Sequence, residues 1–521
     1  MRNPSNLVVL VLALVAAGCS SLAPLVPPDG DADAGPETIA GGRAVAAEGL
    51  QLRLERSLVA ATVADKVRLR QDVQPITGVL TLDEALARAL KYNLDRRARM
   101  MEEALALNQL EASRHDMLPR LIAQAGYSSR DNDLISQSRS AEDGSLSPSR
   151  FISRERNHAL FDLGFTWNAL DFGLGYFGVR QQANRLLIAG EKRRKAMHLL
   201  MQDVRTAYWR AATAQKIGGD LRKAIALAES SLADAVKIEQ SRVRSPLEAM
   251  RYQRQMLENL RLLEAIEQEL SSAQVDLAGL INAPLGQSIV VADMNPVLQT
   301  PAALQLSIEK LEEAALAQNP DLREQHLNAA LAAEEVRKTM LRLFPNISFS
   351  YGLKYDTDRY LVNRDWREAG LQISYNLLNL FTGPAQIDLA KAGVSLAEQR
   401  RLAMHMAVLT QVHLARQQLA SASAQYARAA AIEDVDRRIA QQVGNREAVE
   451  MGSKLERVSA DTSAILSQLR RYQAAAQVQA AENRLLATVG MEPRVGSTGE
   501  LSLAQIVEQV RQQGDPWTTL K

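Results

Sequence analysis

One stretch of this chain occurs twice. Residues 80–93 read LTLDEALARALKYN, and residues 306–319 read LSIEKLEEAALAQN. The asparagines that close the two stretches, Asn93 and Asn319, lie 226 residues apart, and Pro119 and Pro345 keep the same offset. Self-similarity at a constant offset is the signature of a repeated structural unit, so the sequence predicts two copies of one unit.

Later positions repeat at a shorter offset of 208 residues. Trp167 corresponds to Tyr375, and Ser245 corresponds to Ser453. The difference between the offsets falls on the polar stretch 128–157, which is longer than its counterpart. Length variation is typical of exposed loops, so the two copies are predicted to differ mainly in one loop.

Each copy also contains segments in which apolar and polar residues alternate. The clearest is residues 346–355, where Ile347, Phe349 and Tyr351 alternate with serines. Alternation over about 10 residues is typical of transmembrane β-strands, although a half-buried sheet in a soluble protein shows the same pattern. The four segments are residues 121–127, 161–168, 346–355 and 371–377.

Four strands are too few to close a barrel, and open sheet edges are not tolerated in lipid. Several chains must therefore pool their strands, and three chains would supply twelve. The alternating pattern itself thus favours an oligomer.

The helical runs have matching lengths. Residues 173–241 form a run of roughly 100 Å at 1.5 Å per residue, with alanine-rich heptads. Two shorter runs, 81–116 and 246–281, would together equal it in length. The second copy repeats this relation with 383–449 against 307–341 and 454–489. These lengths predict a tube wall in which one long helix lies beside two stacked short ones, with a bend at Gly218-Gly219.

The N-terminal residues are typical of a lipoprotein signal peptide. Arg2 precedes an apolar run, residues 7–17, that is too short to span a bilayer as a helix. The run is followed by Cys19, the only cysteine of the chain, in a setting that resembles a bacterial lipobox. Cys19 is therefore the predicted lipidation site, and Ser20 after it implies export to the outer membrane. Residues 22–48 are predicted to form a flexible tether.

Residues 80–490 resemble the TolC, or outer-membrane-factor, family. The resemblance rests on the duplicated helix–strand–strand–helix–helix unit, on the strand entries Leu118–Leu121 and Phe344-Pro345, and on the strand exits 167–173 and 375–381. It implies a mainly α fold with transmembrane β-strands: a coiled-coil α-barrel, with four strands per chain completing a 12-stranded barrel in a homotrimer. The domains expected are 1–18 signal peptide, 19–79 tether and helix, 80–282 repeat 1, 283–305 linker, 306–490 repeat 2 and 491–521 tail.

The resemblance also implies a function. Such proteins are passive outer-membrane channels with a long periplasmic part, which receive cargo from an inner-membrane pump through a periplasmic adaptor. A tripartite efflux system and type I secretion both remain open, as does the cargo. Many lipid-anchored relatives carry a Pro-x-Tyr-x-x-Pro stretch soon after the cysteine; it is absent here, so the resemblance does not assign the chain to the best-known drug-efflux branch. The alternative from another class is a coiled-coil scaffold lipoprotein, which would not explain the strands.

The periplasmic tip is the predicted docking and gating site. It falls at the two helical turns that correspond to the family's tips, where Ser245 and Ser453 match the family's serine while Arg242 and Glu450 replace its glycine. One hypothesis is that arginines of the first tip pair with glutamates of the second and hold the entrance closed; the alternative is that all are solvated surface charges. The tip residues are Arg242, Val243, Arg244, Ser245, Glu447, Glu450, Gly452 and Ser453.

Other functions find little support. The net charge of +1 gives no reason to expect a nucleic-acid partner. Gly173-Leu174-Gly175-Tyr176-Phe177-Gly178 spells a dinucleotide fingerprint, but the helix after it is far longer than a βαβ crossover. The six histidines form no metal-binding motif. We therefore expect neither enzymatic activity nor a cofactor.

Overall fold

A computed structural model describes residues 58–69, 71, 73–240, 246–287, 289–292, 301–449, 454–491, 501–512 and 517. The chain divides into two units, residues 1–72 and 73–521. In the first unit, residues 58–69 form a helix with exposed side chains. The second unit contains both copies of the repeat.

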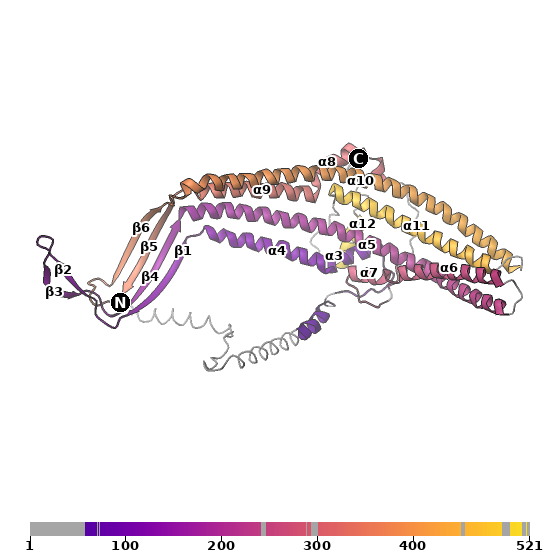
Figure 1. Cartoon of the computed structure of the whole chain (residues 1–521), viewed down its shortest axis with the longest axis horizontal. Helices are drawn as coiled ribbons and strands as arrows, with labels where there is room; N and C mark the ends of the chain where they lie inside the picture. Colours follow the sequence, from indigo (N-terminus) through magenta and orange to yellow (C-terminus); the bar gives the residue numbers. More distant parts are fainter. Residues whose placement is uncertain are drawn as a thin grey trace. The chain divides into compact units, whose positions relative to one another are not determined.

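Two long helices run through this unit, one in each repeat (Figure 1). They are α5 (Ala169–Gln240, 72 residues) and α10 (Asn379–Ala448, 70 residues). Shorter helices α4 (Leu94–Arg114) and α6 (Pro246–Ser271) pack along α5, and α9 (Pro320–Leu341) and α11 (Lys454–Val489) pack along α10. The predicted wall of one long helix beside two stacked short ones is thus confirmed. Helix α5 is continuous through Gly218 and Gly219.

Three of the four predicted short runs are broken. The run 81–116 divides into α3 (Leu82–Tyr92) and α4, and 307–341 divides into α8 (Ile308–Gln318) and α9, because Asn93 and Asn319 adopt an extended conformation. The run 246–281 divides at Ser272 into α6 and α7 (Ala273–Leu280). Short 3₁₀ turns lie at His115–Met117 and Ala302–Gln305.

Asn93 and Asn319, the two asparagines that mark the sequence repeat, make equivalent hydrogen bonds in the two repeats. The side-chain oxygen of Asn319 accepts a hydrogen bond from the Leu322 N–H at 3.0 Å, which caps α9, while its Nδ2 donates to the Thr488 carbonyl at 2.8 Å. Asn93 caps α4 through the Arg96 N–H and donates to the Leu280 carbonyl at 3.1 Å. Each asparagine therefore joins the start of one helix to the end of another.

The residues that end those partner helices also correspond. Asn282 follows α7 with φ of 54°, and Gly490 follows α11 with φ of 80°. Both lie in the left-handed region, which glycine and asparagine tolerate best and which commonly terminates helices. The two sites are 208 residues apart, so the repeat extends to backbone conformation.

The four predicted strands form one antiparallel sheet in the order β1-β4-β5-β6. The bounds are β1 Arg120–Ser129, β4 Asn157–Asn168, β5 Asn346–Asp356 and β6 Asp365–Ser374. The fourth strand was predicted to reach residue 377, but it ends at Ser374 because the Asn376 side chain accepts a hydrogen bond from the Leu378 N–H and starts a turn. Strands β1 and β6 are the open edges of the sheet.

The long polar stretch 128–157 contains a hairpin that the sequence did not reveal. Strands β2 (Ile135–Arg139) and β3 (Leu146–Ile152) pair only with each other and form a separate sheet. The turn between them uses Gly144 at φ of 71°. The strands are rich in serine and arginine, so they lack the apolar alternation from which strands are recognised.

The C-terminal residues return to the middle of the unit. Helix α12 (Leu503–Gln512) packs against α3, where Leu503 and Ile506 are buried with Ala87 and Tyr92. Trp517 is fully buried in the core of repeat 2. Among the helices that the structure describes, none is both long enough and apolar enough to cross a membrane.

Candidate functional site: the open edges and the helical tip

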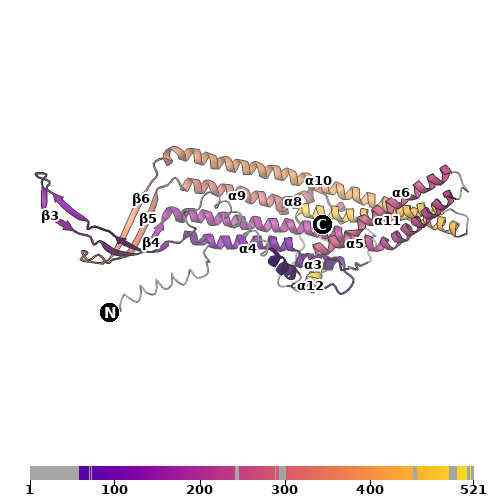
Figure 2. The same cartoon turned by 60° about the horizontal axis from the view of Figure 1, so that its bottom comes forward.

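The helices follow the order of the strands. Packing runs from α4 to α5, from α5 to α9 and from α9 to α10, and Figure 2 shows these four helices side by side. Further from the sheet, the order is α6, α5, α11, α10. The unit is therefore a single layer with two edges: β1, α4 and α6 lie on one edge, and β6 and α10 lie on the other.

Both helical edges expose large apolar side chains. On α10 these are Leu389, Leu396, Leu402, Met406, Leu414, Ile432, Val435 and Ile439. On α4 and α6 they are Leu94, Met101, Leu105, Leu107, Leu247, Met250, Leu257 and Leu262. Contiguous exposed apolar surface marks interaction sites, so both edges have the character of surfaces that another chain covers.

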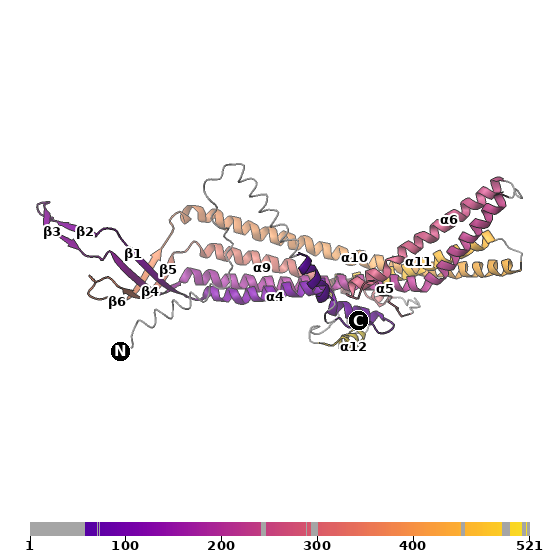
Figure 3. The same cartoon turned by 90° about the horizontal axis from the view of Figure 1, so that it is seen from below.

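The end of the unit opposite the sheet is formed by two helical hairpins, α5–α6 and α10–α11 (Figure 3). An apolar core joins the first hairpin to α11: Ile217, Leu221 and Met256 are buried together with Val458 and Ile465. This core leaves the long helix α10 on the outside, at the edge of the layer.

One ion pair links the two hairpins near their ends. The Lys454 Nζ, at the start of α11, lies 2.8 Å from Asp234 Oδ2 on α5. The hydrogen bond from Lys454 lowers the pKa of the Asp234 carboxyl, and Asp234 in turn raises the pKa of Lys454. Both side chains are about half exposed, so the pair contributes little to global stability. Its importance is positional, because it connects repeat 1 to repeat 2.

A second set of ion pairs joins α10 to α11. Arg457 lies 3.0 Å from Glu447 and 3.2 Å from Asp461, and Arg446 lies 3.6 Å from Glu456. Glu447, one of the predicted gate residues, is thus paired within its own hairpin. The other predicted residues, Cys19, Arg242, Val243, Arg244, Ser245, Glu450, Gly452 and Ser453, lie outside the described residues.

The sequence did not reveal Asp234, Lys454 and Arg457 as tip residues. The heptad pattern assigned the buried positions of the helices and left their charged positions as generic surface. The contacts of these three residues depend on how α11 lies against α5, which no local pattern encodes. The 208-residue offset places Asp234 opposite Gln442 and not opposite Lys454, so the repeat gave no signal either.

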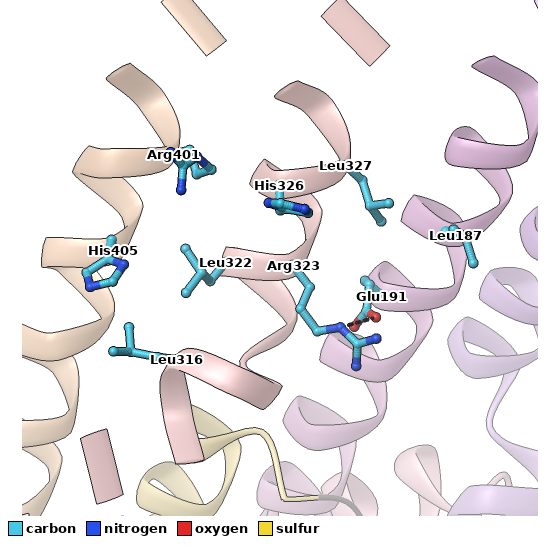
Figure 4. Close-up of a pocket in the computed structure, with 9 residues that line it drawn as sticks. All are labelled: Leu187, Glu191, Leu316, Leu322, Arg323, His326, Leu327, Arg401 and His405. Carbon is cyan, nitrogen blue, oxygen red and sulfur yellow. Dashed lines mark ion pairs between the residues drawn. The ribbon is translucent and has the colours of Figure 1, made fainter. Parts of the chain in front are cut away.

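A groove crosses α5, α8, α9 and α10 (Figure 4), with a volume of about 410 Å³. Its apolar lining consists of leucines, and Arg323 on its rim lies 3.2 Å from Glu191. Glu191 also pairs with Arg194, so its charge is compensated. His326, Arg401 and His405 complete the lining, and no nucleophile with an adjacent base is present in it. Within the described ranges, no cluster of three or more metal-binding side chains occurs.

Gly175 of the apparent dinucleotide motif and its repeat counterpart Gly383 serve helix packing. A Cβ on Gly175 would lie 3.0 Å from the Cγ of Met117, and a Cβ on Gly383 would lie 3.1 Å from the Leu343 side chain. The glycines are 208 residues apart and their neighbours 226 apart, which are the two offsets of the repeat. Glycine therefore lets each long helix begin close to the end of the preceding short helix.

Known proteins share this architecture. Residues 311–491 match the model of a family described as outer membrane efflux protein. The outer-membrane channel OprN is 16% identical, with a TM-score of 0.60 over 79% of this chain and 90% of that one. The Campylobacter jejuni CmeC outer membrane channel is 13% identical, with a TM-score of 0.60 over 85% and 94%. The open state of the Neisseria gonorrhoeae MtrE channel is 16% identical, with a TM-score of 0.58 over 78% and 88%. No curated protein sequence matches the chain significantly.

The fold is that of the TolC-like channels: long helices, a four-stranded sheet and a duplicated unit. The match to the outer membrane efflux protein family covers residues 311–491, which is most of repeat 2, and the fold of the whole unit is similar to that of these channels. Channels of this class are transport proteins and not enzymes.

Proposed function

We propose that three copies of this chain close edge to edge into one channel-tunnel. Strand β6 of one copy pairs with β1 of the next, which gives a 12-stranded barrel, and α10 packs against α4 and α6 of the neighbour. The observation that carries the proposal is that each chain has one open strand edge on each side, and that each edge continues into helices with exposed apolar side chains. A head-to-tail contact of this kind closes into a ring when three successive rotations return to the first copy.

The closed ring is a passive conduit in the outer membrane, with its helical part in the periplasm. Cys19 carries the lipid anchor. A periplasmic adaptor docks at the helical tip, and an inner-membrane pump supplies the energy in a tripartite efflux or type I secretion system. The alternative, a scaffold lipoprotein that forms no channel, leaves the open edges β1 and β6 without a partner.

The test is single-channel conductance of the detergent-extracted protein in a planar bilayer, with the mass of the protein–detergent complex measured alongside. A trimeric mass with discrete conductance steps is expected. A monomeric protein, or a trimer that never conducts, would contradict the channel and favour the scaffold.

We further propose that charges at the tip hold the entrance closed. The Asp234–Lys454 pair restrains the first hairpin against α11, and Arg242 or Arg244 meets Glu447 or Glu450 to complete the closure. An adaptor or pump opens the entrance by separating these groups. Glu447 also contacts Arg457, so one glutamate can hold its own hairpin together while it faces the other tip.

Cells that produce Lys454→Glu should become several-fold more sensitive to a large antibiotic such as vancomycin, because the new carboxylate repels Asp234. The double swap Asp234→Lys with Lys454→Glu should restore resistance. Lys391→Glu is the matched control, since Lys391 is an exposed lysine of α10, far along the chain from the tip, with no ion pair among the described residues. Arg242→Glu tests the other contact. Unchanged sensitivity in both Lys454→Glu and Arg242→Glu would refute the gate.

A further inference from the structure

The β2–β3 hairpin is an isolated two-stranded ribbon with uncovered apolar side chains. Ile135 and Ile152 are cross-strand partners, so they lie on the same face, and they are 54% and 38% exposed. Neither strand pairs with the main sheet. A lone two-stranded hairpin is only marginally stable in water, so a surface that covers this face would stabilise it.

A second uncovered apolar group lies on the β5–β6 loop. Tyr360, Leu361 and Val362 follow one another there, and Val362 is 97% exposed. The base of the loop contacts the segment between β3 and β4, which follows the hairpin. Arg359 lies 2.6 Å from Glu155, and the Asp358 carboxylate accepts hydrogen bonds from the backbone N–H groups of Glu155 and Tyr360.

A buried contact holds the same region. The His158 ring lies 2.9 Å from the Asp356 carboxylate, and both side chains are buried. The apolar tip of the loop is therefore presented by a well-anchored base and is not part of an unstructured segment. Within the described part of the chain, the side chain of Val362 remains almost fully accessible.

The two apolar groups belong to opposite edges of the same end of the sheet. The hairpin follows β1, which ends at Ser129, and the loop precedes β6, which begins at Asp365. Register pairs Ser129 with Asn157 and Asp365 with Tyr355, so both strand ends lie at one end of the sheet. In the ring proposed above, on which this inference rests, β1 of one copy adjoins β6 of the next. The hairpin of one copy then meets the loop of its neighbour.

We propose that the Ile135–Ile152 face of each hairpin covers Tyr360, Leu361 and Val362 of the adjacent copy. The occupant of each apolar surface is thus a second copy of this chain. The contact adds a third interface, beyond the strands and helices, at the end of the barrel farthest from the helices. Among the described residues only repeat 1 carries a hairpin outside the four-stranded sheet, so the ring contains one such contact at each junction between two chains.

Disulfide trapping tests the contact directly, because Cys19 is the only native cysteine. The full-length chain carrying Ile152→Cys and Val362→Cys is oxidised with copper-phenanthroline in outer membranes and analysed on a non-reducing denaturing gel. We expect the single-chain band to convert into bands of two and three chains. Phe151→Cys with Val362→Cys is the matched control, since Phe151 is the neighbouring residue and points to the opposite face; it should give several-fold less product.

Each other outcome overturns the inference. A disulfide within one chain, seen as blocked thiols without a mass increase, would place the hairpin on its own loop. Thiols that react with maleimide but form no disulfide would show that the surfaces do not meet. Equal products from Ile152→Cys and Phe151→Cys would indicate random collision. A trimeric mass with any of these results overturns the hairpin contact alone, whereas a monomeric mass overturns the ring as well.

Discussion

Replacing Asn319 with alanine removes two hydrogen bonds from a buried joint. Asn319 is 3% exposed and connects the start of α9 to the Thr488 carbonyl at the end of α11. Loss of an N-cap side chain costs about 1 kcal/mol. The Thr488 carbonyl would also lose its donor inside the protein, which costs roughly 1–3 kcal/mol. The expected loss in the free energy of unfolding is therefore about 2–4 kcal/mol.

The size of the unit determines the thermal shift. Unfolding entropy is about 2.1 cal/mol/K per residue, and the unit comprises residues 73–521. The unfolding entropy is then roughly 0.9 kcal/mol/K, so each kcal/mol lowers Tm by about 1 °C. Asn319→Ala should lower Tm by about 2–4 °C, measured from helical circular dichroism in detergent.

Two variants make this test specific. Asn319→Asp keeps the cap acceptor and removes the donor, so it should retain the cap and still leave the Thr488 carbonyl unpaired. Asn93→Ala removes the equivalent pair of bonds in repeat 1 and should give a shift of the same size. If Asn319→Ala changes Tm by less than about 1 °C while Asn93→Ala changes it by several degrees, the two joints are not equivalent and the reasoning fails.

The repeat and the tip support three more predictions. Gly490→Ala should lower Tm more than Asn319→Ala, because the new Cβ would lie 2.3 Å from the Gln318 carbonyl oxygen and residue 490 has a positive φ. Asn282→Gly should change Tm by no more than about 1 °C, because glycine tolerates the positive φ of residue 282. Gly383→Leu should lower Tm, measured by the same circular dichroism, since the new side chain would collide with Leu343 of the same chain at the start of α10. Lys454 lowers the pKa of the Asp234 carboxyl below its ordinary 3.8. The ion pair is therefore complete above pH 3.8 and is lost as the pH falls through the lowered pKa. Conductance of the closed channel should stay constant from about pH 8 to 5 and rise only in stronger acid.

Much of the architecture could be predicted because each weak pattern of helix or strand occurs twice, once in each repeat, and the two occurrences support each other. No single strand is decisive, yet Ile347, Phe349 and Tyr351 alternate in a segment whose place in repeat 2 corresponds to that of β1 in repeat 1. Helix lengths follow from apolar periodicity, and residues 454–489 form α11 as predicted. The breaks at Asn93 and Asn319 were missed, although Pro320 at the first position of α9 is a start signal. The periodicity continues across both asparagines and masks the turn.

The tip was harder to predict than the wall. Its ion pairs join residues far apart in sequence, such as Asp234 and Lys454, and charge alone does not distinguish a contact from a solvated side chain. The β2–β3 hairpin was missed for a related reason. Its strands are stabilised by each other and have no buried face of their own, so they left no period in the sequence.

The C-terminal tail shows why two similar repeats do not make two identical halves. Helix α12 is received by α3, where Lys91 donates to the Leu501 carbonyl at 2.6 Å. At the corresponding positions of α8, Ala87 is replaced by Glu313, Lys91 by Ala317 and Tyr92 by Gln318, so repeat 2 offers neither the donor nor the apolar surface.

Repeat 2 contacts Trp517 of the tail, whereas α12 packs against α3 of repeat 1. The indole N–H of Trp517 donates a hydrogen bond to Glu482 at 3.1 Å. The position of Glu482 is occupied by Gln274 in repeat 1. In the proposed ring of three chains, the surface around the tail would therefore alternate between two kinds, one for each repeat. An adaptor that binds there would distinguish repeat 1 from repeat 2, and deletion of α12 should weaken its binding at every second position.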